Sequence, residues 1–116
     1  MVVCLNASSS VIRPLMAAGR FNVNVLSRSH VAVSSAFGGK LKGDARFGVG
    51  DWQRDASGLP YLADAQATLR CAVHQTVEYG THIVVIGEVS EVRFTDEVSP
   101  LIYQNGAYAS ALALNA

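Results

Sequence analysis

The feature that most constrains this chain is the alternation of apolar and polar residues from Gln66 to Tyr79. A period of two residues is typical of a β-strand. One face of this strand carries Ala67, Leu69, Cys71, Val73, Val77 and Tyr79, and the other carries Gln66, Thr68, Arg70, His74, Thr76 and Glu78. We therefore predict a long strand that packs one face on the core and turns the other toward solvent or a partner.

Further strands are predicted on both sides of this one. Residues 1–5 form a short apolar run, which predicts a buried strand, and residues 21–25 alternate like a strand with one buried face. Residues 83–89 are apolar on both faces, which is typical of a central strand. Gly87 inside this run indicates a bulge or a close backbone approach.

Turn and helix signals complete the prediction. An Asn-Gly pair at the middle of residues 101–108 predicts a terminal hairpin. Short helices are predicted over residues 11–18 and 29–36, and residues 38–60, with six glycines, predict a long surface loop. Mostly strands with two short helices indicate a single domain built as an antiparallel barrel or sandwich.

Composition and motif searches exclude several classes of protein. Nine Lys and Arg balance nine Asp and Glu, so the zero net charge offers no basic surface for nucleic acid. No apolar run approaches the roughly 20 residues of a membrane helix. Cys4 and Cys71 form no disulfide framework, which predicts a cytoplasmic location. His30, His74 and His82 lack metal-ligand spacing, and no nucleophile elbow, Walker loop or dinucleotide fingerprint is present.

Two segments carry candidate chemistry. Asn6–Ser10 leads from the first strand into a helix, where unpaired backbone N–H groups and three serine hydroxyls would bind a phosphate. The alternative is that Ser10 only caps the helix. His82 begins the central strand on the same face as Val84 and Ile86, which predicts an inward-pointing ring. From residues alone, it is either a hydrogen-bonded core histidine or a functional one.

A series of short motifs runs through the chain from Met1 to about Leu112. They are Val3–Asn6 with the following serines, Phe21–Leu26, Phe37, Arg46–Phe47, Trp52, Gly58–Leu62, Leu69–Cys71, Gly80–His82, Ile86–Val89, Pro100–Tyr103 and Gly106–Tyr108. In this order they resemble the short-chain flavin reductases, the FMN-binding split-barrel family. Thr81 stands where the family has an aspartate, so His82 has a neutral neighbour in place of a charged one.

The resemblance implies a fold, a cofactor and a set of site residues. The fold is mainly β, an antiparallel split β-barrel with two or three short helices. The flavin ribityl and phosphate are assigned to Asn6, Ala7, Ser8, Ser9 and Ser10, the flavin tail to Phe37, Arg46 and Phe47, the nicotinamide to His82, and a lining position to Tyr108. Trp52 is interpreted as structural. The implied activity is an NAD(P)H:flavin oxidoreductase that uses FMN or FAD, with NADH or NADPH as co-substrate.

The resemblance also implies partners and boundaries. We expect a cytoplasmic homodimer that passes reduced flavin to a monooxygenase component and binds neither nucleic acid nor membrane. Residues 1–116 are expected to form one flavin reductase-like domain that is incomplete at its N-terminal end. Two rival hypotheses remain, a flavin-binding module without turnover and a non-functional fragment. NADH oxidation with added FMN or FAD separates an enzyme from both.

Overall fold

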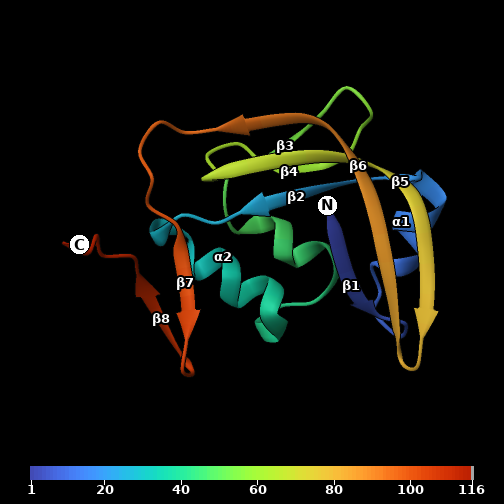
Figure 1. Cartoon of the computed structure of the whole chain (residues 1–116), viewed down its shortest axis with the longest axis horizontal. Helices are drawn as coiled ribbons and strands as arrows, with labels where there is room; N and C mark the ends of the chain where they lie inside the picture. The colour runs from blue at the N-terminus through green and yellow to red at the C-terminus, as the bar shows by residue number, and fades with distance from the viewer. Residues whose placement is uncertain (116) are drawn as a thin grey trace. The chain divides into compact units, whose positions relative to one another are not determined.

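The computed structural model describes residues 1–115 as a set of strands with short helical segments between them (Figure 1). Every strand pair with a defined register is antiparallel. The mainly β fold class predicted from the sequence is therefore confirmed. The chain divides into two compact units: a first unit of residues 1–23 and 69–93, and a second unit of residues 24–68 and 94–116.

A four-stranded sheet makes up most of the first unit. A few residues at the ends of its strands are counted with the second unit. The strands of the sheet are β1 (Val2–Asn6), β6 (His82–Phe94), β5 (Ala67–Tyr79) and β2 (Arg20–Val25), in the spatial order β1-β6-β5-β2. Helix α1 (Ile12–Ala18) connects β1 to β2. The long alternating strand and the central strand predicted from the sequence are both confirmed, as β5 and β6.

The core of the first unit is a cluster of Leu15, Phe21, Cys71 and Val85. The apolar face of β5 contributes Cys71, which is 1% exposed, as its alternation predicts. Gly87 follows Val85 on the same face of β6, and a Cβ built on it would stand 2.6 Å from Cζ of Phe21. Of the two interpretations of Gly87, the close approach is the one that the structure shows.

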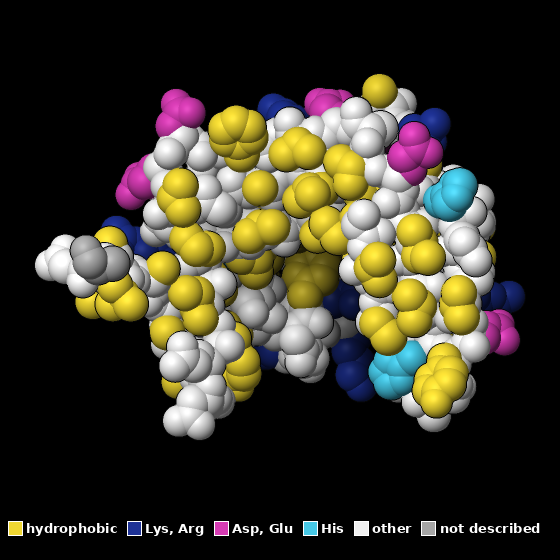
Figure 2. Space-filling model, viewed as in Figure 1, with side chains coloured by type: hydrophobic (Ala, Val, Ile, Leu, Met, Phe, Trp, Pro, Cys, Tyr) yellow, Lys and Arg dark blue, Asp and Glu magenta, His cyan; other side chains and the backbone are white. Residues whose placement is uncertain are grey.

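The first strand is only half buried, so the prediction of a buried strand at residues 1–5 is wrong. β1 is an edge strand that pairs with β6, with Val2 opposite Ile86 and Cys4 opposite Val84. The core cluster covers the face with the odd-numbered residues, whereas Val2 on the other face is 62% exposed. Figure 2 shows hydrophobic side chains gathered over β1 and the adjoining part of β6.

The two predicted helices are present, with shifted ends. α1 begins after Val11 and ends at Gly19, whose φ of 66° is the left-handed conformation that glycine adopts most readily. The second predicted helix, residues 29–36, consists of a 3₁₀ turn η1 (Arg28–His30) and helix α2 (Val31–Ser35). A π-helical turn, η2 (Ala36–Lys40), continues it.

Residues 38–60 were expected to form one long loop, and this prediction is wrong. The segment contains a 3₁₀ helix, η3 (Gly43–Gly48), and strand β3 (Trp52–Arg54), which pairs with β4 (Pro60–Leu62). The Asp55 carboxylate accepts backbone N–H groups in the turn that joins them, and Gly58 there has a φ of 83°. The glycines and aspartates therefore mark the tight turns of a small hairpin.

The core of the second unit is a cluster of Val33, Leu62 and Ala65, with Trp52 packed against it. Gly50 lies against this cluster with a φ of 97°, and a Cβ there would stand 3.0 Å from side-chain carbons of Val33 and Leu62. Both the backbone conformation and the lack of space therefore favour glycine at this position.

Gln66 and Thr68 were placed on the face of the predicted strand that turns toward solvent or a partner, but both are buried. Nε2 of Gln66 donates to Oγ1 of Thr95 at 3.0 Å and to the carbonyl of Glu97 at 2.9 Å. Oδ1 of Asn24 accepts the Thr68 hydroxyl at 3.1 Å and a backbone N–H of β4, also at 3.1 Å. These polar groups can be buried because each finds a partner distant in the sequence.

The terminal hairpin predicted from the Asn-Gly pair is confirmed. β7 (Leu101–Gln104) pairs with β8 (Ala107–Ser110) through a turn in which Asn105 has a φ of 53° and Gly106 a φ of 76°. Positive φ at both central residues is the requirement of the tight turn that matches the twist of a hairpin.

Candidate functional site

The segment after β1 is held by its own polar groups. Oδ1 of Asn6 accepts the Ser8 backbone N–H at 2.9 Å and the Ser8 hydroxyl at 2.7 Å. The N–H of Ser9 donates to the Asn6 carbonyl at 2.9 Å, and that of Ala7 donates to the Thr81 carbonyl at 2.9 Å. The loop is thus fixed both to itself and to the turn between β5 and β6, and its side chains remain at the surface.

The three serines have different surroundings. The alternative that Ser10 caps the helix is wrong, because the N-cap position belongs to Val11 and carries no side-chain hydrogen bond. Ser9 comes closest to that role, since its Oγ lies 3.4 Å from the Val11 backbone nitrogen. Among residues 1–115, the Ser10 hydroxyl has no hydrogen-bond partner, and its side chain is exposed. Ser10 can therefore donate a hydrogen bond to a bound molecule.

His82 lies directly across from Asn6 in the pairing of β6 with β1. Its ring was predicted to point inward, but this is wrong, because the odd-numbered residues of β6 face the core and His82 is exposed on the opposite side. Nδ1 of His82 is 2.9 Å from Oγ1 of Thr81. The hydroxyl in place of the family's aspartate therefore still orients the ring and leaves Nε2 turned away from Thr81.

An aromatic cluster in the second unit contains Phe37, Phe47 and Trp52. The three ring centroids are 5.1 to 5.2 Å apart, in edge-to-face and tilted arrangements that are favourable for aromatic pairs. Trp52 is fixed by a 2.8 Å hydrogen bond from Nε1 to the Val49 carbonyl, which agrees with its interpretation as structural. Phe47 is 36% exposed, so part of the cluster faces solvent.

Arg46 lies on this cluster. Its guanidinium carbon is 5.5 Å from the centroid of the Phe37 ring, a cation–π distance, and its Nε donates to the Gly43 carbonyl at 2.9 Å. These two contacts fix the side chain, while its terminal nitrogens retain N–H groups for an anion. The structure thus brings together Phe37, Arg46 and Phe47, which the resemblance assigned to one segment of the ligand.

Tyr108 on β8 is anchored to helix α2. Its hydroxyl donates to Oγ of Ser34 at 3.0 Å and lies 3.4 Å from Oγ of Ser35. The Ser34 hydroxyl first, and the Ser35 hydroxyl second, can turn to donate to the phenolate, and this stabilisation of the charged form lowers the pKa of Tyr108. Sequence reasoning missed both serines, since the contact joins positions 74 residues apart and no local motif signals it.

The predicted site residues thus form two sets. Within the first unit, Asn6 and Ala7 lie beside Thr81 and His82 at one end of the sheet, and the three serines continue the same loop. Within the second unit, Phe37, Arg46 and Phe47 form one cluster, and Tyr108 on β8 is hydrogen-bonded to α2. The first set offers neutral hydroxyl, amide and imidazole groups, and the second offers aromatic faces and a guanidinium.

Across residues 1–115, no group of three or more His, Cys, Asp or Glu side chains is placed to hold a metal ion. None of the helices in the same range has the length and apolar character needed to cross a membrane.

Several known proteins are similar to this chain in sequence. The model of the flavin reductase like domain family matches residues 1–112. The reductase component of an FADH2-dependent resorcinol hydroxylase from Rhizobium sp. strain MTP-10005 is 38% identical over 96% of this chain and 62% of its own. The NADH-dependent FMN reductase RutF of Variovorax paradoxus strain S110 is 42% identical, with 93% and 60% covered. The chain therefore spans about three fifths of the length of these relatives.

Solved structures of flavin reductases superpose on this chain. The Streptomyces globisporus NADH:FAD oxidoreductase SgcE6 superposes with a TM-score of 0.86 at 26% identity, over 97% of this chain and 68% of that one. Flavin reductase PheA2 superposes with a TM-score of 0.81 at 27% identity, over 97% and 70%. The split-barrel fold class expected from the resemblance is confirmed, and the chain belongs to the flavin reductase like domain family.

Proposed function

We propose that this chain acts as an NAD(P)H:flavin oxidoreductase that supplies reduced FMN or FAD to a partner monooxygenase. Family membership supports the reaction class, and the named relatives include an NADH-dependent FMN reductase and the reductase component of a hydroxylase. The observation that carries the proposal is the pairing of β1 with β6. It sets His82 opposite Asn6, so a group suited to nicotinamide and a loop suited to flavin lie at one end of one sheet.

The donors at this end of the sheet fit a flavin side chain. The ribityl chain is a neutral polyol, and polyols are recognised by hydroxyl and amide groups that can both donate and accept. The exposed Ser10 hydroxyl and the Asn6–Ser9 turn provide such groups. Separately, in the second unit, Arg46 offers a guanidinium beside the Phe37–Phe47 pair, which suits a phosphate of the flavin tail.

The chemistry of hydride acceptance comes from the flavin, and the protein supplies position and electrostatics. Thr81 orients the His82 ring through Nδ1, so that Nε2 can contact the nicotinamide or its carboxamide. A hydroxyl that donates to Nδ1 leaves the ring proton on Nε2, which then acts as a donor. Holding both reacting rings in place replaces a bimolecular encounter with an oriented pair. No carboxylate acid or base is required for this transfer.

Association is part of the proposal. We expect a homodimer, because the exposed apolar face of β1 and the edge of its sheet are features that proteins usually cover. Light scattering at micromolar concentration measures the mass directly. A monomer that binds and reduces flavin would contradict this part of the proposal and leave the reaction untouched.

The test of the reaction is steady-state oxidation of NADH and of NADPH with FMN or FAD. We expect His82→Ala to raise KM for the reduced nicotinamide, lower turnover, and leave flavin affinity nearly unchanged. His74→Ala is the matched control, because His74 is also an exposed histidine on this sheet. If KM and turnover of His82→Ala both stay within about twofold, which is below about 0.5 kcal/mol, the assignment of His82 is wrong.

Two outcomes would favour the rival hypotheses over an enzyme. Flavin binding without oxidation of either nicotinamide would indicate a binding module. A chain that neither binds nor reduces flavin would indicate a non-functional fragment.

A further inference from the structure

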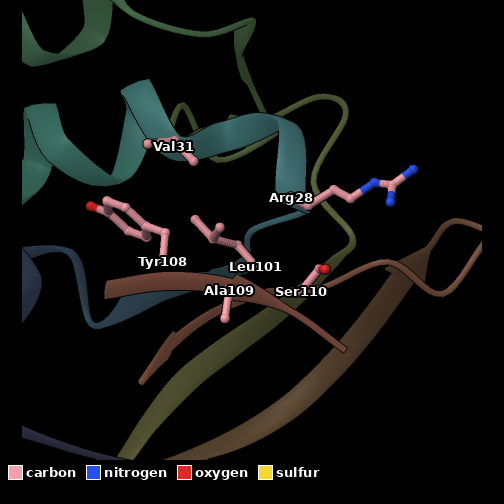
Figure 3. Close-up of a pocket in the computed structure, with 6 residues that line it drawn as sticks. All are labelled: Arg28, Val31, Leu101, Tyr108, Ala109 and Ser110. Carbon is pink, nitrogen blue, oxygen red and sulfur yellow. The ribbon is translucent and has the colours of Figure 1, made fainter. Parts of the chain in front are cut away.

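We propose that a pocket in the second unit binds the adenylate portion of a dinucleotide. The pocket is lined by Arg28, Val31, Leu101, Tyr108, Ala109 and Ser110 and has a volume of about 310 Å³. It lies between the β7–β8 hairpin and the η1–α2 segment (Figure 3). The inference rests on the proposed function and extends it, because it assigns a part of the nucleotide to residues that include neither His82 nor the Asn6–Ser10 loop.

Backbone bonds fix the two walls of this pocket at one end. The N–H of Arg28 donates to the Ser99 carbonyl at 3.0 Å, and that of Leu101 donates to the Leu26 carbonyl at 2.8 Å. Ser27 and Pro100 form an isolated β-bridge between these two bonds. The start of the hairpin is thus joined to the start of η1.

Side-chain bonds fix the walls at the other end. Tyr108 reaches from β8 to the hydroxyls of Ser34 and Ser35 on α2. Tyr103 packs against the Tyr108 ring, with centroids 5.2 Å apart in an edge-on arrangement. Because both ends are tied, the hairpin is held at a set distance from α2, and the space between them is preformed. A preformed site binds with less ordering cost than one that must assemble around its ligand.

The lining combines one cation with an apolar floor. Val31 and Leu101 supply aliphatic surface, and the Tyr108 ring forms one end, whereas the Ala109 methyl group points away from the helix (Figure 3). Arg28 stands at the opposite end, where its side chain extends outward at the rim. Among the described residues, the Arg28 guanidinium has no hydrogen-bond or ion-pair partner. Its five N–H donors are available to an anion.

These features match an adenine nucleotide. A flat, weakly polar ring suits the aliphatic floor and the tyrosine, and a phosphate suits a guanidinium. The volume is near the lower limit of ligand pockets, about 300 Å³, so the pocket fits a fragment of a dinucleotide and not the whole molecule. The proposed reaction brings two sources of adenylate to the protein, NAD(P)H and FAD, whereas FMN has none.

The first experiment titrates the unmodified chain with AMP and follows the heat of binding, without flavin or turnover. We expect saturable binding that Arg28→Met weakens about tenfold, the effect of losing a charged hydrogen bond, and that Arg28→Lys weakens less. Lys40→Met is the matched control, because Lys40 is an exposed cation of the same unit outside the pocket, and should bind AMP like the parent.

The second experiment identifies the source of the adenylate. If it comes from FAD, Arg28→Met should weaken FAD binding and spare FMN. If it comes from the nicotinamide dinucleotide, the variant should raise KM for NADH and spare reduced nicotinamide mononucleotide.

The inference is overturned if AMP shows no saturable binding at millimolar concentration. It is equally overturned if the chain reduces flavin and Arg28→Met changes neither the affinity for FAD nor KM for NADH. It is also overturned if benzoate binds in an Arg28-dependent way and AMP does not, which would assign the pocket to small aromatic acids. Loss of flavin reduction alone would count against the proposed function, since AMP binding is measured independently.

Discussion

Gly87→Ala should destabilise the first unit through a contact that can be worked out atom by atom. The added Cβ would stand 2.6 Å from Cζ and 2.9 Å from Cε1 of Phe21, and 3.1 Å from Cβ of Cys71. Carbon atoms in favourable contact are about 3.5–4.0 Å apart. The overlap with the ring is therefore about 1 Å. Phe21 is 8% exposed and packed in the core cluster, so its ring cannot move aside freely.

The magnitude follows from two opposing effects. Overpacking of a core costs about 1–3 kcal/mol. Replacing glycine by alanine returns about 0.4–1 kcal/mol, because the unfolded chain loses freedom. The expected net loss is about 1–2 kcal/mol, and at about 4 °C per kcal/mol the melting temperature should fall by about 4–8 °C.

The assay is thermal and urea unfolding followed by circular dichroism. Gly38→Ala is the matched control, because a Cβ at Gly38 meets no atom within 4 Å and its φ is not positive. Phe21→Leu removes the ring atoms in the overlap, so it should cost less in the Gly87→Ala background than in the parent. Effects that add within about 0.3–0.5 kcal/mol would refute the steric argument.

Three further predictions concern other polar and sulfur groups. Asn24→Leu removes the acceptor of two hydrogen bonds and should lower the free energy of unfolding by about 2 kcal/mol or more. Asn24→Asp keeps the acceptor and should lower it less, so equal losses in urea unfolding would contradict this prediction. Because Ser34 lowers the pKa of Tyr108, the 295 nm titration should begin at lower pH in the parent than in Ser34→Ala, and coincident curves would disprove it. Burial raises the pKa of the Cys71 thiol and shields it, so a thiol reagent should modify exposed Cys4 alone before denaturation, and Cys4→Ser should abolish that fast phase.

The sequence predicted those elements that are determined by residues close together in the chain. The Asn105-Gly106 pair predicted its hairpin because two positive φ angles are a requirement of that turn. The alternation of β5 correctly placed Leu69, Cys71 and Val73 on the core, but Val77 and Tyr79, predicted on the same face, are exposed because the strand runs beyond the core cluster. By contrast, the burial of Gln66 depends on partners about 30 residues away, and a pattern of polar residues alone indicates solvent.

The candidate site was likewise predicted only in part. The resemblance indicated which residues to examine, and the register of β1 and β6 placed His82 beside the Asn6 loop. The direction of the His82 ring was predicted wrongly, because Val84 and Ile86 are apolar residues that lie on the less buried face of β6. The contact of Tyr108 with α2 lies outside any local pattern, since it depends on how the hairpin packs.

The discontinuity of both units has a consequence for synthesis on the ribosome. β1 emerges before β6, which is its neighbour in the sheet within residues 1–115 and whose pairing residues follow about 80 residues later. At about 5–20 residues per second, an apolar nascent segment waits several seconds for its partner strand. The strands of the sheet therefore cannot pair in the order in which they are synthesised. Such a delay favours folding after release, or shelter of the early segment by a chaperone during elongation.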